Sequence, residues 1–70
     1  MKGKWKARIL YLDPQGETKW RTVILDCLKW GSTEWYPEPQ FIWWAYDLER
    51  RAKRGFALDC VLSVEFLEFL

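Results

Sequence analysis

The residues best suited to ligand chemistry form a short basic run in the second half of the chain. It holds four basic side chains in five positions: Arg50, Arg51, Lys53 and Arg54. Arginine binds phosphate and carboxylate groups through two parallel hydrogen bonds, so this run has the composition of an anion-binding site. The plainer interpretation is a solvated hairpin tip that keeps an edge of the fold soluble. Both interpretations remain open from the sequence alone.

Aromatic residues gather around residues 31–40, a proline-containing stretch that we expect to be a loop. Trp30 precedes this stretch, and Trp35 and Tyr36 lie within it. Exposed Trp and Tyr side chains often anchor protein interfaces, which makes these three candidate partner-binding residues. Alternatively, they fold back and cap one end of the domain.

A third pattern lies at the N-terminus, where Lys2, Lys4 and Lys6 alternate with Gly3 and Trp5. In an extended segment the lysines would share one face. Interleaved aromatic and basic residues are typical of single-stranded nucleic-acid binding, in which bases stack on the rings. A frayed, solubilising terminus is the alternative.

Catalytic and metal chemistry have little support in the composition. The chain has no histidine, which removes the Ser-His and Cys-His pairs that activate nucleophiles. Two cysteines without histidine are a poor basis for structural zinc, and the four glycines form no phosphate-binding loop. Paired carboxylates are the catalytic arrangement left open. We therefore expect a protein that is not an enzyme and holds no metal or cofactor.

Charge and hydropathy narrow the class of protein further. Eleven basic and ten acidic residues leave a net charge of +1, which argues against both a tight electrostatic DNA binder and an acidic DNA mimic. No apolar signal-peptide core follows the basic start, and no run approaches the roughly 20 apolar residues of a membrane span. We expect a cytoplasmic protein without membrane association, in which Cys27 and Cys60 are reduced.

One domain of 70 residues must position these side chains. Aromatic residues make up 19% of the chain, and large rings supply the core that a short chain otherwise lacks. Residues 7–12 and 18–28 are rich in residues that favour strands, and residues 13–16 between them have a type I turn signature. This pattern predicts a β-hairpin.

The next segment is ambiguous. Apolar residues fall at helical spacing through residues 41–52, whereas residues 41–46 also form an aromatic and β-branched run of strand length. Beyond it, residues 55–58 read as a short strand. The alternation that begins at residues 63–66 predicts a half-buried final strand over residues 62–69.

Two of these segments carry a family resemblance. Residues 43–49 and 54–61 resemble the core hairpin of WYL domains, whose pattern is roughly Trp-Tyr-Leu-x-Ala-Tyr-Asp, a turn, then Arg-x-Phe-Arg-Leu-Asp-Arg-Ile. The resemblance covers about residues 8–64 of a single domain spanning 1–70. The name-giving tripeptide is replaced by residues 41–43, and Ala57 and Cys60 stand where the family usually has ligand-pocket arginines. Only Arg54 keeps a basic position of that set.

The resemblance implies an all-β fold, a small five-stranded barrel of the Sm-like or SH3-like kind. Residues 41–46 would then be a strand, 48–54 a turn and 59–61 a second short turn, with an open sheet edge for ligands or other protomers. It also implies an accessory regulator of bacterial or phage type that senses nucleic acid or a nucleotide-like ligand. The expected site is Arg54 with Arg50, Arg51 and Lys53. The rival expectation is a protein-interaction module, either an oligomeric adaptor or a mobile-element inhibitor of a host protein, that uses Trp30, Trp35 and Tyr36.

Overall fold

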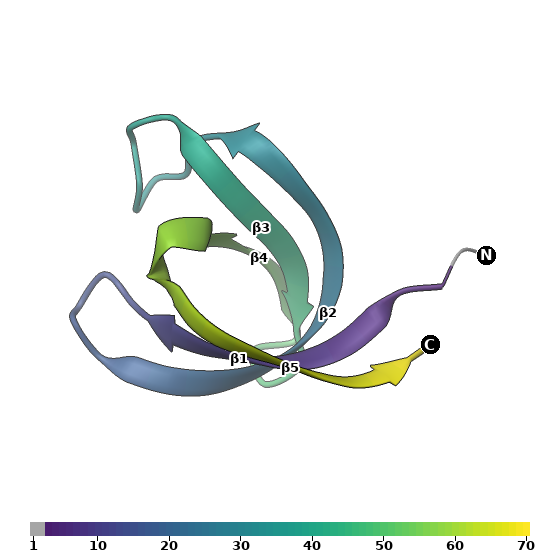
Figure 1. Ribbon diagram of the computed structural model, residues 1–70. Coiled ribbons are helices and arrows are strands. Elements are labelled where there is room, and N and C mark those ends of the chain that lie inside the picture. Colours follow the sequence, from purple (N-terminus) through teal and green to yellow (C-terminus); the bar gives the residue numbers. More distant parts are fainter. Residues whose placement is uncertain (1–2) are drawn as a thin grey trace.

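The computed structural model describes residues 3–70, which form five antiparallel strands in a single sheet (Figure 1). The strands are β1 (Trp5–Leu12), β2 (Thr18–Gly31), β3 (Gln40–Asp47), β4 (Ala52–Ala57) and β5 (Val61–Phe69). A turn of 3-10 helix, η1 (Leu58–Cys60), joins β4 to β5. The strand order β4-β3-β2-β1-β5 confirms the all-β prediction. Within residues 3–70, no helix is long and apolar enough to cross a membrane.

The ambiguous segment at residues 41–46 is a strand. β3 pairs with β2 along one edge and with β4 along the other, so its aromatic residues lie in a central strand of the sheet. The helical interpretation of this segment is wrong. The turn that follows spans only residues 48–51, where Arg51 has a φ of 54° and its N–H donates to the Asp47 carbonyl at 2.7 Å. Lys53 and Arg54 therefore lie in β4 instead of on the hairpin tip.

The sheet is sharply bent, and β2 is the strand that bends it. Residues 18–24 of this 14-residue strand pair with β1, whereas residues 23–31 pair with β3. The β2–β3 register shifts between Leu25 and Cys27, which leaves Asp26 as an extra residue in a bulge. Bulges increase the local twist and bend a strand, and Figure 1 shows β2 curving from one half of the sheet into the other.

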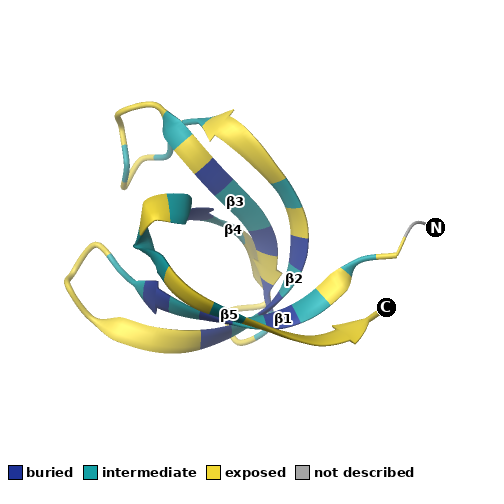
Figure 2. Cartoon of the chain, viewed as in Figure 1, coloured by how far each residue is buried: buried dark blue, intermediate teal, exposed yellow. Residues whose placement is uncertain are grey.

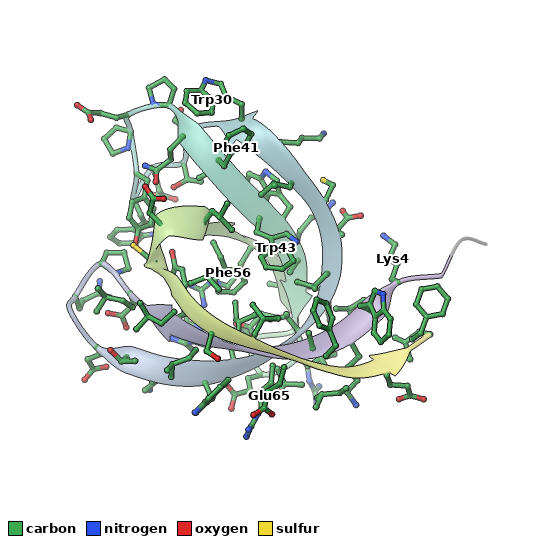
Figure 3. The ribbon with its side chains drawn as sticks, in the orientation of Figure 1. Lys4, Trp30, Phe41, Trp43, Phe56 and Glu65 are labelled. Atoms are coloured by element: carbon green, nitrogen blue, oxygen red, sulfur yellow. The ribbon has the colours of Figure 1, made fainter. Side chains whose placement is uncertain are left out.

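The core lies on the concave side of this bend. On β1 every second residue is buried, namely Ala7, Ile9 and Tyr11, as expected for a strand with one face inward. The rest of the buried cluster comes from β2, β3 and β4: Val23, Leu25, Ala45 and Phe56. Figure 2 shows buried residues along the middle of β1, β2 and β3, whereas β5 is exposed over most of its length. Trp43, on β3, is partly buried and packs against this core (Figure 3).

No backbone pairing joins β4 to β5 within the described chain, and side chains bridge this gap instead. The Tyr11 hydroxyl accepts a hydrogen bond from the Ala57 N–H at 3.0 Å and donates to the Tyr36 hydroxyl at 3.2 Å. Tyr36 in turn donates to the Cys60 sulfur at 3.7 Å. Burial raises the pKa of Tyr36, and its hydrogen bonds to Tyr11 and Cys60 raise it further, so this phenol stays neutral. Both Cys27 and Cys60 are free and half-buried.

Replacing Tyr11 with phenylalanine should destabilise the protein although the ring and its packing remain. The change leaves the buried Ala57 N–H without an acceptor, which costs about 1–3 kcal/mol. Urea denaturation measures this loss. Tyr46→Phe is the matched control, since Tyr46 is 41% exposed. Equal unfolding midpoints for the two variants would show that the bridge contributes nothing.

Candidate anion-binding site

The four predicted ligand-binding residues do not converge on one site. Arg50 and Arg51 lie in the turn at residues 48–51, and Lys53 and Arg54 are neighbours in β4. Successive strand residues point to opposite faces, so Lys53 and Arg54 diverge. Lys53 pairs with Asp26 at 3.1 Å, whereas Arg54 pairs with a different carboxylate.

Arg54 is held in place by Asp47. The Asp47 carboxylate is fully buried and accepts hydrogen bonds from the Glu49 N–H at 3.0 Å and the Arg50 N–H at 3.2 Å. Its second oxygen accepts from Arg54 Nη1 at 3.2 Å. The Arg54 guanidinium also lies over the Phe56 ring, 5.1 Å from its centroid. These contacts fix the guanidinium in one orientation next to the turn.

Arg21, a further arginine of this region, was not identified as a site residue by the sequence analysis. Arg21 is only 6% exposed, because it lies on the concave face of β2 opposite Ile9. Its Nη1 is 4.0 Å from the Glu49 carboxylate, and its buried Nε has no hydrogen-bond partner. A signal was present, since Arg21 has the same strand parity as the apolar Val23 and Leu25. A basic residue in such a stripe is a candidate for a buried charge.

These arginines meet at a small hollow. It has a volume of about 110 Å³ and is lined by the side chains of Arg21, Arg50, Arg54 and Trp35 and by residues 13–15. This is roughly the space of four water molecules, enough for one phosphate or carboxylate group. The Asp13 carboxylate also lines the hollow, but it already accepts hydrogen bonds from the N–H groups of Gln15 and Glu17. Neither Arg51 nor Lys53 is among the lining residues.

The three candidate aromatic residues are separated in the same way. Tyr36 folds back onto the domain, where its hydroxyl bonds to Tyr11 and to Cys60. Trp35 is 61% exposed and lies at the arginine hollow. Trp30, 65% exposed, lies at the far end of β2, where its ring meets Phe41 edge-on at 5.1 Å (Figure 3). Only Trp35 therefore joins the basic site.

Of the N-terminal lysines, Lys4 forms an ion pair and Lys6 lies opposite an acidic residue. Lys4 Nζ lies 2.7 Å from the Asp26 carboxylate, and Lys6 is directly opposite Glu68 in the β1–β5 pairing (Figure 3). Trp5 makes edge-on contacts with the rings of Phe66 and Phe69. Lys2, the third lysine of the pattern, lies outside the described residues.

The hollow offers one kind of chemistry, which is hydrogen-bond donation to an anion from rigid guanidinium groups. Across residues 3–70, no group of three His, Cys, Asp or Glu side chains is placed to hold a metal ion. No protein-family model matches the chain, and no match was found among curated proteins or solved structures. Comparison with known proteins therefore identifies no site residues.

Proposed function

We propose that this chain is a small regulatory binding module that recognises a phosphate-bearing ligand, a nucleotide or nucleic acid, through Arg21, Arg50 and Arg54. The observation that carries the proposal is the Arg21 guanidinium, which is buried with an unpartnered Nε and a carboxylate no nearer than 4.0 Å. Leaving a buried charge without partners costs several kcal/mol. Arg21 lines the hollow, so a ligand oxyanion bound there adds a counter-charge that Glu49 supplies only at 4.0 Å.

An unpartnered Nε does not by itself indicate a ligand site, as Arg8 shows. Its Nε is also without a partner, but its Nη2 lies 2.8 Å from the Glu65 carboxylate on the convex side of β1 (Figure 3). The same guanidinium lies over the Trp20 ring at 4.3 Å. Arg8 is therefore a satisfied surface group. Arg21 combines deep burial, a weak counter-ion and a hollow large enough for a ligand.

The proposal includes a fold and a family. We propose that the bent sheet is a small barrel of the SH3-like or Sm-like kind and that the chain is a divergent WYL-like domain. The bulge at Asp26 and the Tyr11–Ala57 hydrogen bond across the open side of the sheet support this geometry. Arg54 supports the family assignment, because it keeps a basic position of the WYL pattern. The proposal places the module in the cytoplasm and gives it no catalytic role.

Replacing Arg54 with glutamine should weaken binding of adenosine 5′-monophosphate by about 10- to 150-fold, because a charged hydrogen-bond donor contributes about 1.5–3 kcal/mol. Arg50→Gln should act more mildly, since Arg50 lies on an exposed turn and loses more side-chain entropy on engagement. Arg51→Gln is the matched control and should change nothing. NMR titration measures all three affinities.

Inorganic phosphate, titrated in parallel, tests whether the anion alone is recognised. Arg54→Lys keeps the charge and loses the planar fork, so an intermediate affinity is expected. Equal effects of the Arg51 and Arg54 substitutions, or no saturable binding by the unmodified chain, would overturn the proposed function.

The second candidate function is a protein-interaction module that acts through exposed aromatic residues, as an adaptor, an inhibitor or a homo-oligomer. One observation favours it: the edge-on pair of Trp30 and Phe41 is 65% and 48% exposed, beside Leu28 at 49%. Exposed aromatic clusters of this kind anchor protein interfaces. Under this function, Trp30→Ala abolishes self-association measured by sedimentation or capture of a partner, whereas Arg54→Gln leaves both unchanged.

A further inference from the structure

A second aromatic and basic surface lies on the opposite side of the sheet from the core. On β3, Trp44 and Tyr46 flank the fully buried Ala45 and therefore point to the other face. Trp44 is half-buried and Tyr46 is 41% exposed. Two successive outward positions of a central strand thus present rings to solvent.

The Trp44 ring has a fixed position because β4 has a glycine beneath it. Gly55 is the direct cross-strand neighbour of Trp44. A Cβ at Gly55 would lie 3.0 Å from Trp44 Cζ3 and 2.7 Å from Ile42 Cγ2, closer than these groups tolerate. The indole therefore lies against the bare backbone of β4, which places it at the floor of the surface.

Three hollows cover this face and share their walls. Their volumes are about 480, 310 and 300 Å³, sizes typical of sites for small organic groups. Lys53 lines all three, and Trp44 lines the first two. The second hollow also includes Trp35 and Arg54, which belong to the arginine hollow described above. We call these three adjoining hollows the groove; its second hollow borders the arginine hollow.

The groove is basic although the whole chain is nearly neutral. Lys4, Lys29 and Lys53 line it, against the carboxylates of Asp26 and Glu34. Lys4 and Lys53 share the Asp26 carboxylate at 2.7 and 3.1 Å, and hydrogen bonds from Lys4 and then Lys53 lower the pKa of Asp26. Two ammonium groups are thus held in place by one carboxylate, which leaves a positive charge on the pair.

We propose that this groove, comprising Trp44, Tyr46, Lys4, Lys29 and Lys53, is a binding track for single-stranded nucleic acid that leads into the arginine hollow. Base stacking on aromatic rings is indifferent to sequence, and lysines neutralise the phosphates between stacked bases. A single strand is specified because only unpaired bases have faces that are free to stack on these rings. The inference extends the proposed function from a nucleotide to a strand, but it depends on different side chains.

The test is fluorescence anisotropy with a labelled 12-residue thymidine oligonucleotide, measured across a salt series. Tyr46→Ala should weaken binding by about 5- to 150-fold, the range expected for loss of one base–aromatic stack. Tyr46→Phe keeps a stacking ring and should bind as the unmodified chain does. Circular dichroism confirms that each variant is folded.

Lys29→Gln should reduce the salt dependence by about one unit of slope, the effect of one lost phosphate contact. Lys19→Gln is the matched control, because Lys19 is an exposed lysine in the half of β2 that pairs with β1 and lines none of these hollows. Unchanged oligonucleotide binding in the Tyr46→Ala and Lys29→Gln variants overturns the track. Binding of the complementary duplex as tight as that of the single strand, or preference for an acidic peptide, overturns it as well.

The two proposals fail separately. If Arg54→Gln weakens adenosine monophosphate binding while the Tyr46 and Lys29 variants bind the oligonucleotide normally, the track is wrong and the arginine site stands. If the Tyr46 and Lys29 variants lose oligonucleotide affinity while Arg54→Gln has no effect on the mononucleotide, the arginine site is wrong and the track stands.

Discussion

Replacing Arg21 with methionine is expected to stabilise the free protein and abolish phosphate binding at the same time. The Arg21 guanidinium is buried beside a single carboxylate at 4.0 Å, so its desolvation is poorly compensated. Exchange of a buried ionic group for an apolar side chain of similar volume is often neutral or stabilising by about 1–4 kcal/mol. Methionine is long, unbranched and flexible, so it suits this buried position opposite Ile9. Urea denaturation and phosphate titration measure the two effects.

Arg8→Met is the matched control for this substitution. Arg8 also lies in a strand, but it pairs with Glu65 at 2.8 Å and is partly exposed, so both stability and phosphate binding should stay within a few tenths of a kcal/mol. Phosphate should raise the melting temperature of the Arg8 variant and leave that of the Arg21 variant unchanged, since only a ligand bound to the folded state stabilises it. An Arg21 variant that still binds phosphate would show that the buried guanidinium has no ligand role.

The strands were predictable because local chemistry specifies them. The turn at residues 13–16 forms as its Pro and Gly indicate, with the Asp13 side chain accepting from the backbone of Gln15 and Glu17. Alternation along residues 7–11 places Ala7, Ile9 and Tyr11 in the core. These features depend on residues close in sequence, and local preference and tertiary structure agree there.

The local sequence pattern alone does not determine the secondary structure of residues 41–46. Their apolar residues satisfy both the helical and the strand period, and the choice is made by β2 and β4, which offer backbone partners on both sides. The position of Trp35 is equally non-local. The loop folds back because Thr33 and Tyr36 exchange backbone hydrogen bonds and the Tyr36 hydroxyl reaches Tyr11, 25 residues earlier.

The candidate site was predicted in part. Arg50 and Arg54 line the hollow, whereas Arg51 and Lys53, from the same basic run, do not. Lys53 precedes Arg54 in β4, where successive side chains point to opposite faces. Arg21 joins Arg50 and Arg54 from a strand nearly 30 residues away. Its burial depends on the bend in β2, which follows from the Asp26 bulge and the pairing with two different strands. The spacing of residues in the sequence does not predict that bend.

Replacing Asp47 with alanine should destabilise the protein by about 3 kcal/mol, because it removes one member of a buried ion pair and leaves the other without compensation. The same change frees the N–H groups of Glu49 and Arg50, whose bonds to Asp47 hold the turn. A domain of this size is stable by roughly 3–10 kcal/mol, so the variant should unfold well below the urea midpoint of the unmodified chain. An unchanged midpoint would mean that the turn forms without its aspartate.

Asparagine at position 47 separates the structural role of Asp47 from its effect on the ligand. The amide oxygen still accepts from Glu49 and Arg50, so Asp47→Asn should cost less stability than Asp47→Ala. The amide nitrogen cannot accept from Arg54, which loses its 3.2 Å partner and the adjacent negative charge. Phosphate no longer competes with a buried carboxylate for this guanidinium, and its affinity should rise by about tenfold at low salt. Asp59→Asn, an exposed change in η1, is the control. A folded Asp47→Asn variant with weaker phosphate binding would show that Asp47 orients Arg54 for the ligand instead of competing with it.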